Sequence, residues 1–429
     1  MRYLVFFLLL LFSFSSSAQF DKWKRKINKT LDDVNEGITT GQRVAYTAQH
    51  ALYLIEASKR TTKQFNETVR VSRGDAAPAE QKRLEGLRVK NGKIKELNWE
   101  PVVYHGEDIF PSAILGLAAY QGKRSSELRA ISHPVGFRIV STRQNVAIRW
   151  ELISVDQQFF DRVSGVLDYR QAGQEVYVMP EIPWNFAKLA RNASPTPVSL
   201  LFRIYDESGK FVELNKTVAV RSVNDCLFRY DGTDLGLLFT AYVQESHPEI
   251  DQILAEALTA GYTNSFAGYQ GDEQSVLRQV AAVYHALHER GIKYSSGTTP
   301  SKTNNPKVSS QQVRTFANAI KYRQANCVDG TVVFASILRR IGISAGFVLV
   351  PGHCFLVFSA DAEGKDLRFL ETTLLSNASF LAKTSLSNPE SYRKAMVQQV
   401  GLALSVGHQA FDKAARTNQA NVVGLAKSR

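Results

Sequence analysis

Three residues of the types that cooperate in thiol enzymes follow one another in this sequence: Cys327, His353 and Glu371. A thiolate attacks carbonyl groups, an imidazole carries the proton, and a carboxylate orients the imidazole. Their order alone says little, because each residue type is common. The segments around them, QANCVDGTVVFASILRRIGI, GFVLVPGHCFLVFS and LRFLETT, predict a helix followed by two strands. If the three side chains meet, the chain is a cysteine-nucleophile enzyme of acyl transfer.

Cys327 is expected at the N-terminus of a largely buried helix that stops at Gly342. The partial positive charge of a helix start stabilises a thiolate, and its free backbone N–H groups can stabilise an oxyanion. Gln324 and Asn326 are candidates for a side-chain contribution to that oxyanion hole. Asp329 is expected to complement the helix dipole rather than to take part in catalysis. The alternative for Cys327 is an ordinary buried cysteine.

The apolar run 347–358 indicates a central strand in which His353 is the only strongly basic group. Pro351 and Gly352 just before it suggest a strand entry or a bulge that could aim the ring. Glu371 should lie on the next strand. If that strand pairs antiparallel with the strand of His353, Glu371 can accept a hydrogen bond from the imidazole. The alternatives are a core histidine bonded to a backbone carbonyl and a surface glutamate at a strand end.

Other residues around the three candidates are open to two interpretations. Thr372 and Thr373 either support the carboxylate or are plain strand residues, and Tyr294 is either a cleft residue or a packing residue. Cys226 and Cys354 are expected to be small buried hydrophobes, although a bridge between them stays open. With no second CxxC or HxxxH pair near Cys327 or His353, neither a metal nor another cofactor is predicted.

The rest of the chain divides by composition and periodicity. Arg2, an apolar run and a small-residue stretch predict a cleavable signal peptide, hence export to the periplasm or the extracellular space. No later apolar run is long enough to span a membrane. Short alternating runs between turn residues predict an Ig-like β-sandwich. The predicted domains are a signal peptide (1–18), a helical N-terminal segment (19–97), the β-sandwich (98–225), an α+β domain with the three candidates (226–385) and a C-terminal helix (386–429).

Within the third domain, the sequence predicts a helix over Glu273–Arg290 that ends before Gly291, and a long polar loop over 295–310. Ser309 or Ser310 is expected to cap the next helix, which runs to about Tyr322. The formal charge of +12 is spread along the chain. Together with export, this spread favours solubility and mild attraction to acidic surfaces over a nucleic-acid partner.

The segments around Cys327, His353 and Glu371 resemble motifs of the transglutaminase-like superfamily. The resemblance covers residues 235–385 and is to an exported bacterial member. ANCVDGTVVFASILRRIGI is similar to the family's Cys helix, PGHCFLVF to its His strand and LETT to its acidic strand. Glu371 stands where many members have Asp, and Cys354 stands where an aromatic residue often follows the His.

This resemblance implies a papain-like α+β core with an antiparallel sheet and a Cys327–His353–Glu371 triad without a cofactor. The family includes cross-linking enzymes, peptidases, amidases and inactive members. The expected function is therefore an exported hydrolase or acyltransferase acting on amide bonds of a peptide or protein. The alternative is a non-catalytic binding or assembly protein of the cell envelope that holds an envelope protein partner.

Overall fold

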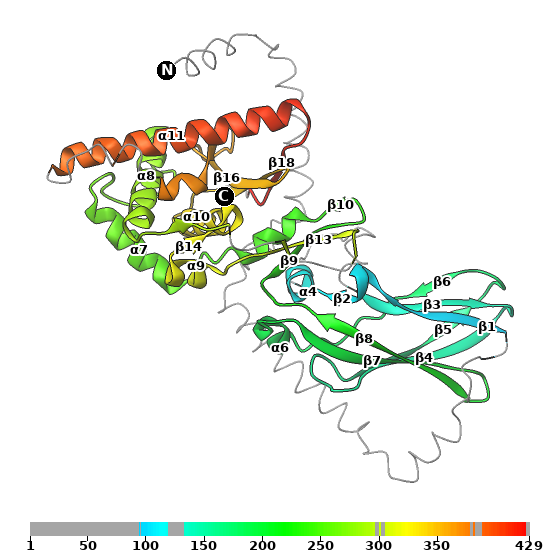
Figure 1. Ribbon diagram of the computed structural model, residues 1–429. Coiled ribbons are helices and arrows are strands. Elements are labelled where there is room, and N and C mark those ends of the chain that lie inside the picture. The colour runs from blue at the N-terminus through cyan, green and yellow to red at the C-terminus, as the bar shows by residue number, and fades with distance from the viewer. Residues whose placement is uncertain are drawn as a thin grey trace.

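The computed structural model describes residues 94, 96–118, 133–296, 300–301, 305–377, 381 and 388–425. The predicted signal peptide and nearly all of the predicted helical N-terminal segment lie outside these residues. The described part has an α+β fold, with a β-rich region followed by a helix-rich region (Figure 1). Among its helices, none is long and apolar enough to cross a membrane.

The β-rich region consists of two sheets that pack across one core. One sheet has the strand order β2-β8-β7-β4-β5 and the other has the order β1-β3-β6; only β2 and β8 run parallel. The strands are β1 (Leu97–Val103), β2 (Asp108–Ile109), β3 (Val135–Ser141), β4 (Val146–Ser154), β5 (Arg162–Tyr169), β6 (Val176–Val178), β7 (Thr196–Tyr205) and β8 (Phe211–Val220), and the region also holds the turn η1 (Tyr104–Glu107) and helix α6 (Phe186–Arg191).

Alternate residues of these strands point inward, as the two-residue period requires. The Phe137 ring of β3 lies 5.6 Å from that of Trp150 in β4 and 5.3 Å from that of Phe202 in β7, measured between centroids. Side chains from both sheets therefore fill one apolar layer, as the alternating pattern over 98–225 predicts.

The helix-rich region holds three further sheets, with strand orders β17-β16-β15-β18, β10-β9-β13-β12 and β11-β14. The first two are antiparallel and the β11–β14 pair is parallel. The strands are β9 (Asp225–Tyr230), β10 (Thr233–Asp234), β11 (Lys293–Tyr294), β12 (Pro300–Ser301), β13 (Val308–Gln312), β14 (Gln324–Ala325), β15 (Ala345–Val350), β16 (His353–Ser359), β17 (Leu367–Leu370) and β18 (Asn421–Val423). The helices are η2 (Gly236–Tyr242), α7 (Pro248–Thr259), α8 (Glu273–Glu289), α9 (Phe316–Tyr322), α10 (Cys327–Arg340), η3 (Thr372–Ser376) and α11 (Pro389–Arg416).

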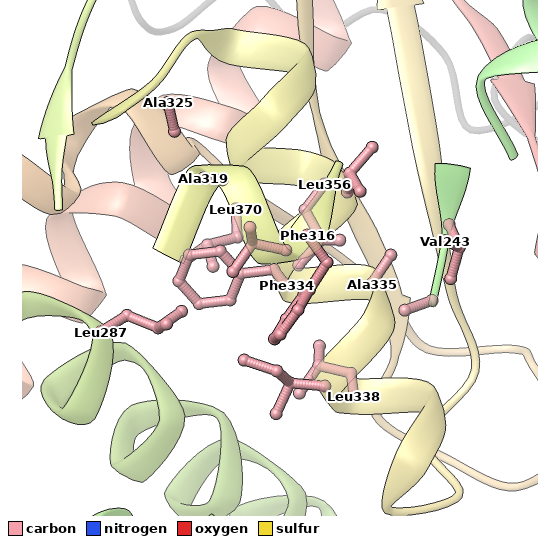
Figure 2. Packing of buried hydrophobic residues seen from close by; sticks show 14 of the residues in the cluster. Val243, Leu287, Phe316, Ala319, Ala325, Phe334, Ala335, Leu338, Leu356 and Leu370 are labelled. Atoms are coloured by element: carbon pink, nitrogen blue, oxygen red, sulfur yellow. The ribbon is translucent and has the colours of Figure 1, made fainter. Parts of the chain in front are cut away.

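Helix α10 lies at the centre of this region and is buried along most of its length. Figure 2 shows Phe334 and Leu338 of α10 among apolar side chains from other elements, which include Leu287 of α8, Phe316 of α9, Leu356 of β16 and Leu370 of β17. A fully buried side chain of this size contributes about 1.5–3 kcal/mol to folding. This packing fixes α10, and with it the position of its first residue.

Helix α4 (Pro111–Ala118) belongs to both cores. It lies between the β-rich and helix-rich regions in Figure 1, and the hydroxyl of Ser112 donates to the Asp225 carbonyl at 2.6 Å. Apolar side chains at this helix enter the two cores on different sides. Those in the sandwich core are Ile114 and Leu115, and those in the other core are Phe110, Ala113 and Leu117.

The segment predicted as one central strand over 347–358 is a hairpin. Strands β15 and β16 pair with Val350 opposite His353, so the loop between them has only two residues. Pro351 has no N–H to donate to a ladder, and Gly352 has a φ of 73°, which side chains other than glycine disfavour. Pro followed by Gly therefore forms a tight turn, where the continuous apolar pattern indicated a single strand.

Ser309 and Ser310 do not cap a helix, contrary to the prediction. They lie in β13, which pairs with β9 and has a register shift between these two serines. The following helix, α9, begins at Phe316, and the Thr315 hydroxyl caps it by accepting the Asn318 N–H at 3.3 Å. The polar composition of the segment concealed a strand whose backbone is bonded to distant β9. By contrast, the predicted helix that ends before Gly291 is confirmed as α8.

The C-terminal segment is more than a helix. Helix α11 ends at Arg416, and β18 then pairs with β15. The half-buried Arg339 guanidinium holds this strand by donating to the carbonyls of Ala345 in β15 and of Gly424 just after β18. Residues 388–425 therefore complete the helix-rich domain rather than follow it.

Candidate active site

Cys327 is the first residue of α10 and carries a free, partly exposed thiol. Asn326 precedes it as the N-cap, and its Oδ1 accepts the Asp329 N–H at 2.8 Å. The Asp329 carboxylate in turn accepts the Asn326 N–H at 3.0 Å. These reciprocal bonds form a capping box, which explains why the helix begins at Cys327.

Asp329 is fully buried and serves the helix start. Besides Asn326, its carboxylate accepts two bonds from Arg314, one from the backbone N–H and one from the guanidinium, each 2.8 Å long. A carboxylate with these partners is held in place and is unsuited to proton transfer. The structure therefore gives Asp329 the helix-start position expected for it, while the pairing with Arg314 had no local signal in the sequence.

His353 begins β16, directly after the Pro351–Gly352 turn, and its ring is partly exposed. Its Nε2 lies 2.6 Å from Glu371 Oε2, so Nδ1 is the ring nitrogen left for Cys327. Hydrogen bonds with Cys327 and Glu371 outweigh burial and raise the pKa of His353 to about 10. The ring is therefore an imidazolium at neutral pH.

Glu371 follows β17, the antiparallel neighbour of β16, and caps η3. It is only 4% exposed, so the surface interpretation is wrong. Its Oε1 accepts the backbone N–H of Thr373 at 3.0 Å and the hydroxyl of Thr373 at 2.6 Å. Burial alone would raise the pKa of Glu371, but the bonds from His353 and Thr373 lower it below its ordinary value. Glu371 is thus an ionised partner of the imidazolium.

The other two cysteines are buried and free. Cys354 Sγ lies 3.7 Å from Thr331 Oγ1, and that hydroxyl donates to the Cys327 carbonyl at 2.8 Å. Burial raises the pKa of both Cys226 and Cys354, which leaves them as neutral thiols. The bridge that the sequence left open between these two cysteines is not formed.

Tyr294 lies beside the site and not in the core. It is 48% exposed, which makes the packing interpretation wrong, and in the register of β11 and β14 it is opposite Ala325. Partial burial and the nearby charges of Cys327 and Glu371 raise its pKa. Its hydroxyl therefore faces the same electrostatic environment as the thiol and the carboxylate.

The two candidates for the oxyanion hole differ in their surroundings. The side-chain oxygen of Asn326 is used in the capping box, whereas Gln324 is exposed, with its Oε1 3.5 Å from the Arg314 guanidinium. Because the Asp329 N–H is also bonded within the capping box, the backbone N–H groups of Cys327 and Val328 are the first-turn donors left for an oxyanion.

The described residues contain no cluster of three or more His, Cys, Asp or Glu side chains that could hold a metal ion. What they bring together is a thiol, an imidazolium and a buried carboxylate, an arrangement that can generate and use a nucleophilic sulfur. No family model, curated protein or solved structure matches the chain.

Proposed function

We propose that this chain is a cysteine-nucleophile hydrolase or acyltransferase that acts on amide bonds of peptides or proteins through Cys327, His353 and Glu371. The observation that carries the proposal is the 2.6 Å bond from His353 Nε2 to the buried Glu371, on a ring whose pKa is also raised by Cys327. A carboxylate so placed fixes the orientation of the ring and favours its charged form.

In this mechanism the Cys327 thiolate attacks the amide carbonyl carbon, and the negative charge moves to the carbonyl oxygen. The N–H groups of Cys327 and Val328 stabilise that oxyanion. His353 gives its proton to the leaving amine, which departs as the C–N bond breaks and a thioester forms. Water or an amine then attacks the thioester, His353 takes the proton of the attacking group, and Cys327 leaves as thiolate. Glu371 stays ionised throughout.

The finer structural assignments belong to the same proposal: a transglutaminase-like, papain-like core, an Ig-like sandwich, and export through a cleaved signal peptide. The three sequence motifs that resemble the transglutaminase-like superfamily support the first. The alternating strands of the two-sheet core support the second, and the apolar N-terminal run supports the third.

Alkylation of Cys327 tests the proposal without a known substrate. Iodoacetamide reacts with thiolates, and a reference thiol ionises near pH 8.5, so an ordinary cysteine reacts slowly at about pH 6. We expect Cys327 to react at about pH 6 at least tenfold faster than a free thiol, and His353→Ala to remove that advantage. Mass spectrometry separates Cys327 from the buried Cys226 and Cys354, which serve as internal controls.

A slow reaction at pH 6 that His353→Ala leaves unchanged would overturn the proposal. It would favour the alternative of a non-catalytic binding or assembly protein of the cell envelope. In that alternative, Cys327→Ser would retain the ability to bind its partner.

A further inference from the structure

The stretch that leads to the nucleophile is strongly basic. Between Gly291 and Val328 the sequence has no Asp or Glu, and its basic residues are Lys293, Lys302, Lys307, Arg314, Lys321 and Arg323. The segment that carries His353, residues 342–360, contains no Asp, Glu, Lys or Arg. The net positive charge of the stretch that leads to Cys327 is therefore high because no acidic residue in it offsets the basic ones.

Three of these cations form what we call the cationic ledge: Lys293, Lys321 and Arg323. The Lys293 N–H donates to the Arg323 carbonyl at 2.9 Å, and Lys293 is the register partner of Gln324. Arg323 ends α9 with a φ of 52°, and Lys321 is in the last turn of that helix. Arg323 is only four residues before Cys327, so their Cα atoms are at most about 14 Å apart.

The charges of the ledge are not neutralised within the described residues. All three side chains are exposed, and none has a carboxylate within ion-pair distance there. Other cations of the stretch are paired, since Arg314 bonds Asp329 and Lys307 bonds Asp231. The ledge therefore presents positive charge to solvent that no described carboxylate offsets, and such charge can attract an acidic ligand.

Two exposed aromatic rings accompany the ledge. Tyr294 is 48% exposed and Tyr322 is 58% exposed, and the Lys321 Nζ lies 5.4 Å from the centre of the Tyr322 ring. Exposed tyrosines next to cations suit an acidic peptide. Its carboxylates can pair with the cations while the methylene groups of the same side chains contact the tyrosine rings.

We propose that the substrate is an acidic peptide segment that binds to the cationic ledge and so places its amide bond at Cys327. This inference rests on the proposed function and adds the charge of the substrate to it. Attraction over this range is electrostatic, so it must weaken as salt shortens the Debye length, which is about 10 Å at 0.1 M ionic strength.

The first test compares two alkylating agents on the full chain. Iodoacetate is anionic and iodoacetamide is neutral, so the ratio of their rates on Cys327 measures the local potential. We expect Lys293→Glu combined with Arg323→Glu to lower this ratio about three- to tenfold at low salt, and the exposed control Lys210→Glu to leave it unchanged. An equal ratio in the wild type and the double variant would refute an effect of the cationic ledge on the potential at Cys327.

The second test uses peptides as probes. A hexapeptide of glutamates should slow the reaction of Cys327 with iodoacetamide at about 20 mM salt, and should lose this effect at about 500 mM salt and in the double variant. The same length of glutamine or of lysine should protect less. Equal protection by all three peptides, or none by any, would refute an acidic substrate.

The two proposals fail in distinguishable ways. If iodoacetamide reacts slowly at pH 6 irrespective of His353, the thiol enzyme is refuted, whatever the ledge attracts. If that reaction is fast and depends on His353 while the ratio and the peptides show no effect of charge, only the substrate class is refuted.

Discussion

Gly330 of α10 lies directly against the side chain of Thr372, the residue after Glu371. A Cβ atom at Gly330 would come within 2.8 Å of Thr372 Oγ1 and 3.1 Å of its Cβ, and real Cβ atoms essentially never approach under 3.0 Å. The helix that carries the nucleophile and the turn that follows the carboxylate therefore approach each other at a distance that glycine allows.

Gly330→Ala should separate the two elements and weaken the triad. We expect the reaction of Cys327 with iodoacetamide at about pH 6 to slow about tenfold, because a small displacement of a charged pair is costly. Thr372→Ala, which removes Oγ1, should restore part of the rate. Gly401→Ala in α11 is the matched control: a Cβ there meets nothing within 4 Å. It should stabilise the chain by about 0.5–1 kcal/mol in urea unfolding and leave the rate unchanged. Wild-type reactivity in Gly330→Ala would show that the close approach has no role in the site.

Glu371→Gln should keep the shape of the side chain and remove its charge. Without the carboxylate the imidazolium loses a partner, so the pKa of His353 falls and the rate of Cys327 alkylation at pH 6 drops at least tenfold. Thr373→Val is the milder comparison, because it removes the hydroxyl bond to Glu371 Oε1 and keeps the backbone N–H bond. We expect a loss of about two- to fivefold there. An unchanged rate in Glu371→Gln would exclude the glutamate from the triad.

The raised pKa of His353 sets a pH dependence with a definite sign. The pKa of His353 is about 10 in the folded protein, above the ordinary 6.5. The free energy that its charged form contributes to folding is therefore fully present below pH 6.5 and is lost as the pH rises through about 10. The difference in unfolding free energy between the wild type and His353→Gln should therefore shrink from pH 6 to pH 10, as urea titrations can measure. Acyl transfer should decline over the upper part of this range, because the leaving amine needs the proton.

Since Cys327 is the largest cause of the raised pKa of His353, Cys327→Ala should lower that pKa in an NMR titration. A value still near 10 in that variant would contradict the pairing.

Asp329→Ala should destabilise the chain far more than the loss of an exposed acid. It would leave the Arg314 guanidinium beside an empty site and remove half of the capping box, at a cost of about 3–5 kcal/mol. Asp251→Ala breaks the exposed pair with Arg340 and should cost less than about 1 kcal/mol. Urea unfolding of both variants checks the contrast. Similar losses in the two would mean that Asp329 is not a structural anchor of α10.

Local patterns were enough to predict the helix of Cys327 and two neighbouring strands near His353 and Glu371. His353 begins its strand rather than lying inside it, and Glu371 follows β17 and caps η3 rather than lying on the strand. The apolar spacing after Asn326 predicted a helix that begins at Cys327, and the two-residue period before Glu371 predicted a strand next to that of His353. In each case the signal lies within a few residues of the position it defines, because caps and alternation act locally.

What the sequence did not show depends on partners far along the chain. Arg314 reaches Asp329 only because α9 folds back beside α10, and β18 pairs with β15 some seventy residues earlier. The local sequence of Ser309 and Ser310 is typical of a helix cap, but pairing with the distant strand β9 places both serines in a strand. The hairpin at Gly352 was readable in principle from Pro followed by Gly, but the apolar run on both sides favoured a single strand.

The position of α4 has a consequence for how the chain unfolds. Because one helix fills part of each core, neither core can lose its structure without exposing apolar side chains of the other. The sandwich and the helix-rich region should then melt in a single cooperative transition, with equal calorimetric and van't Hoff enthalpies, instead of one after the other.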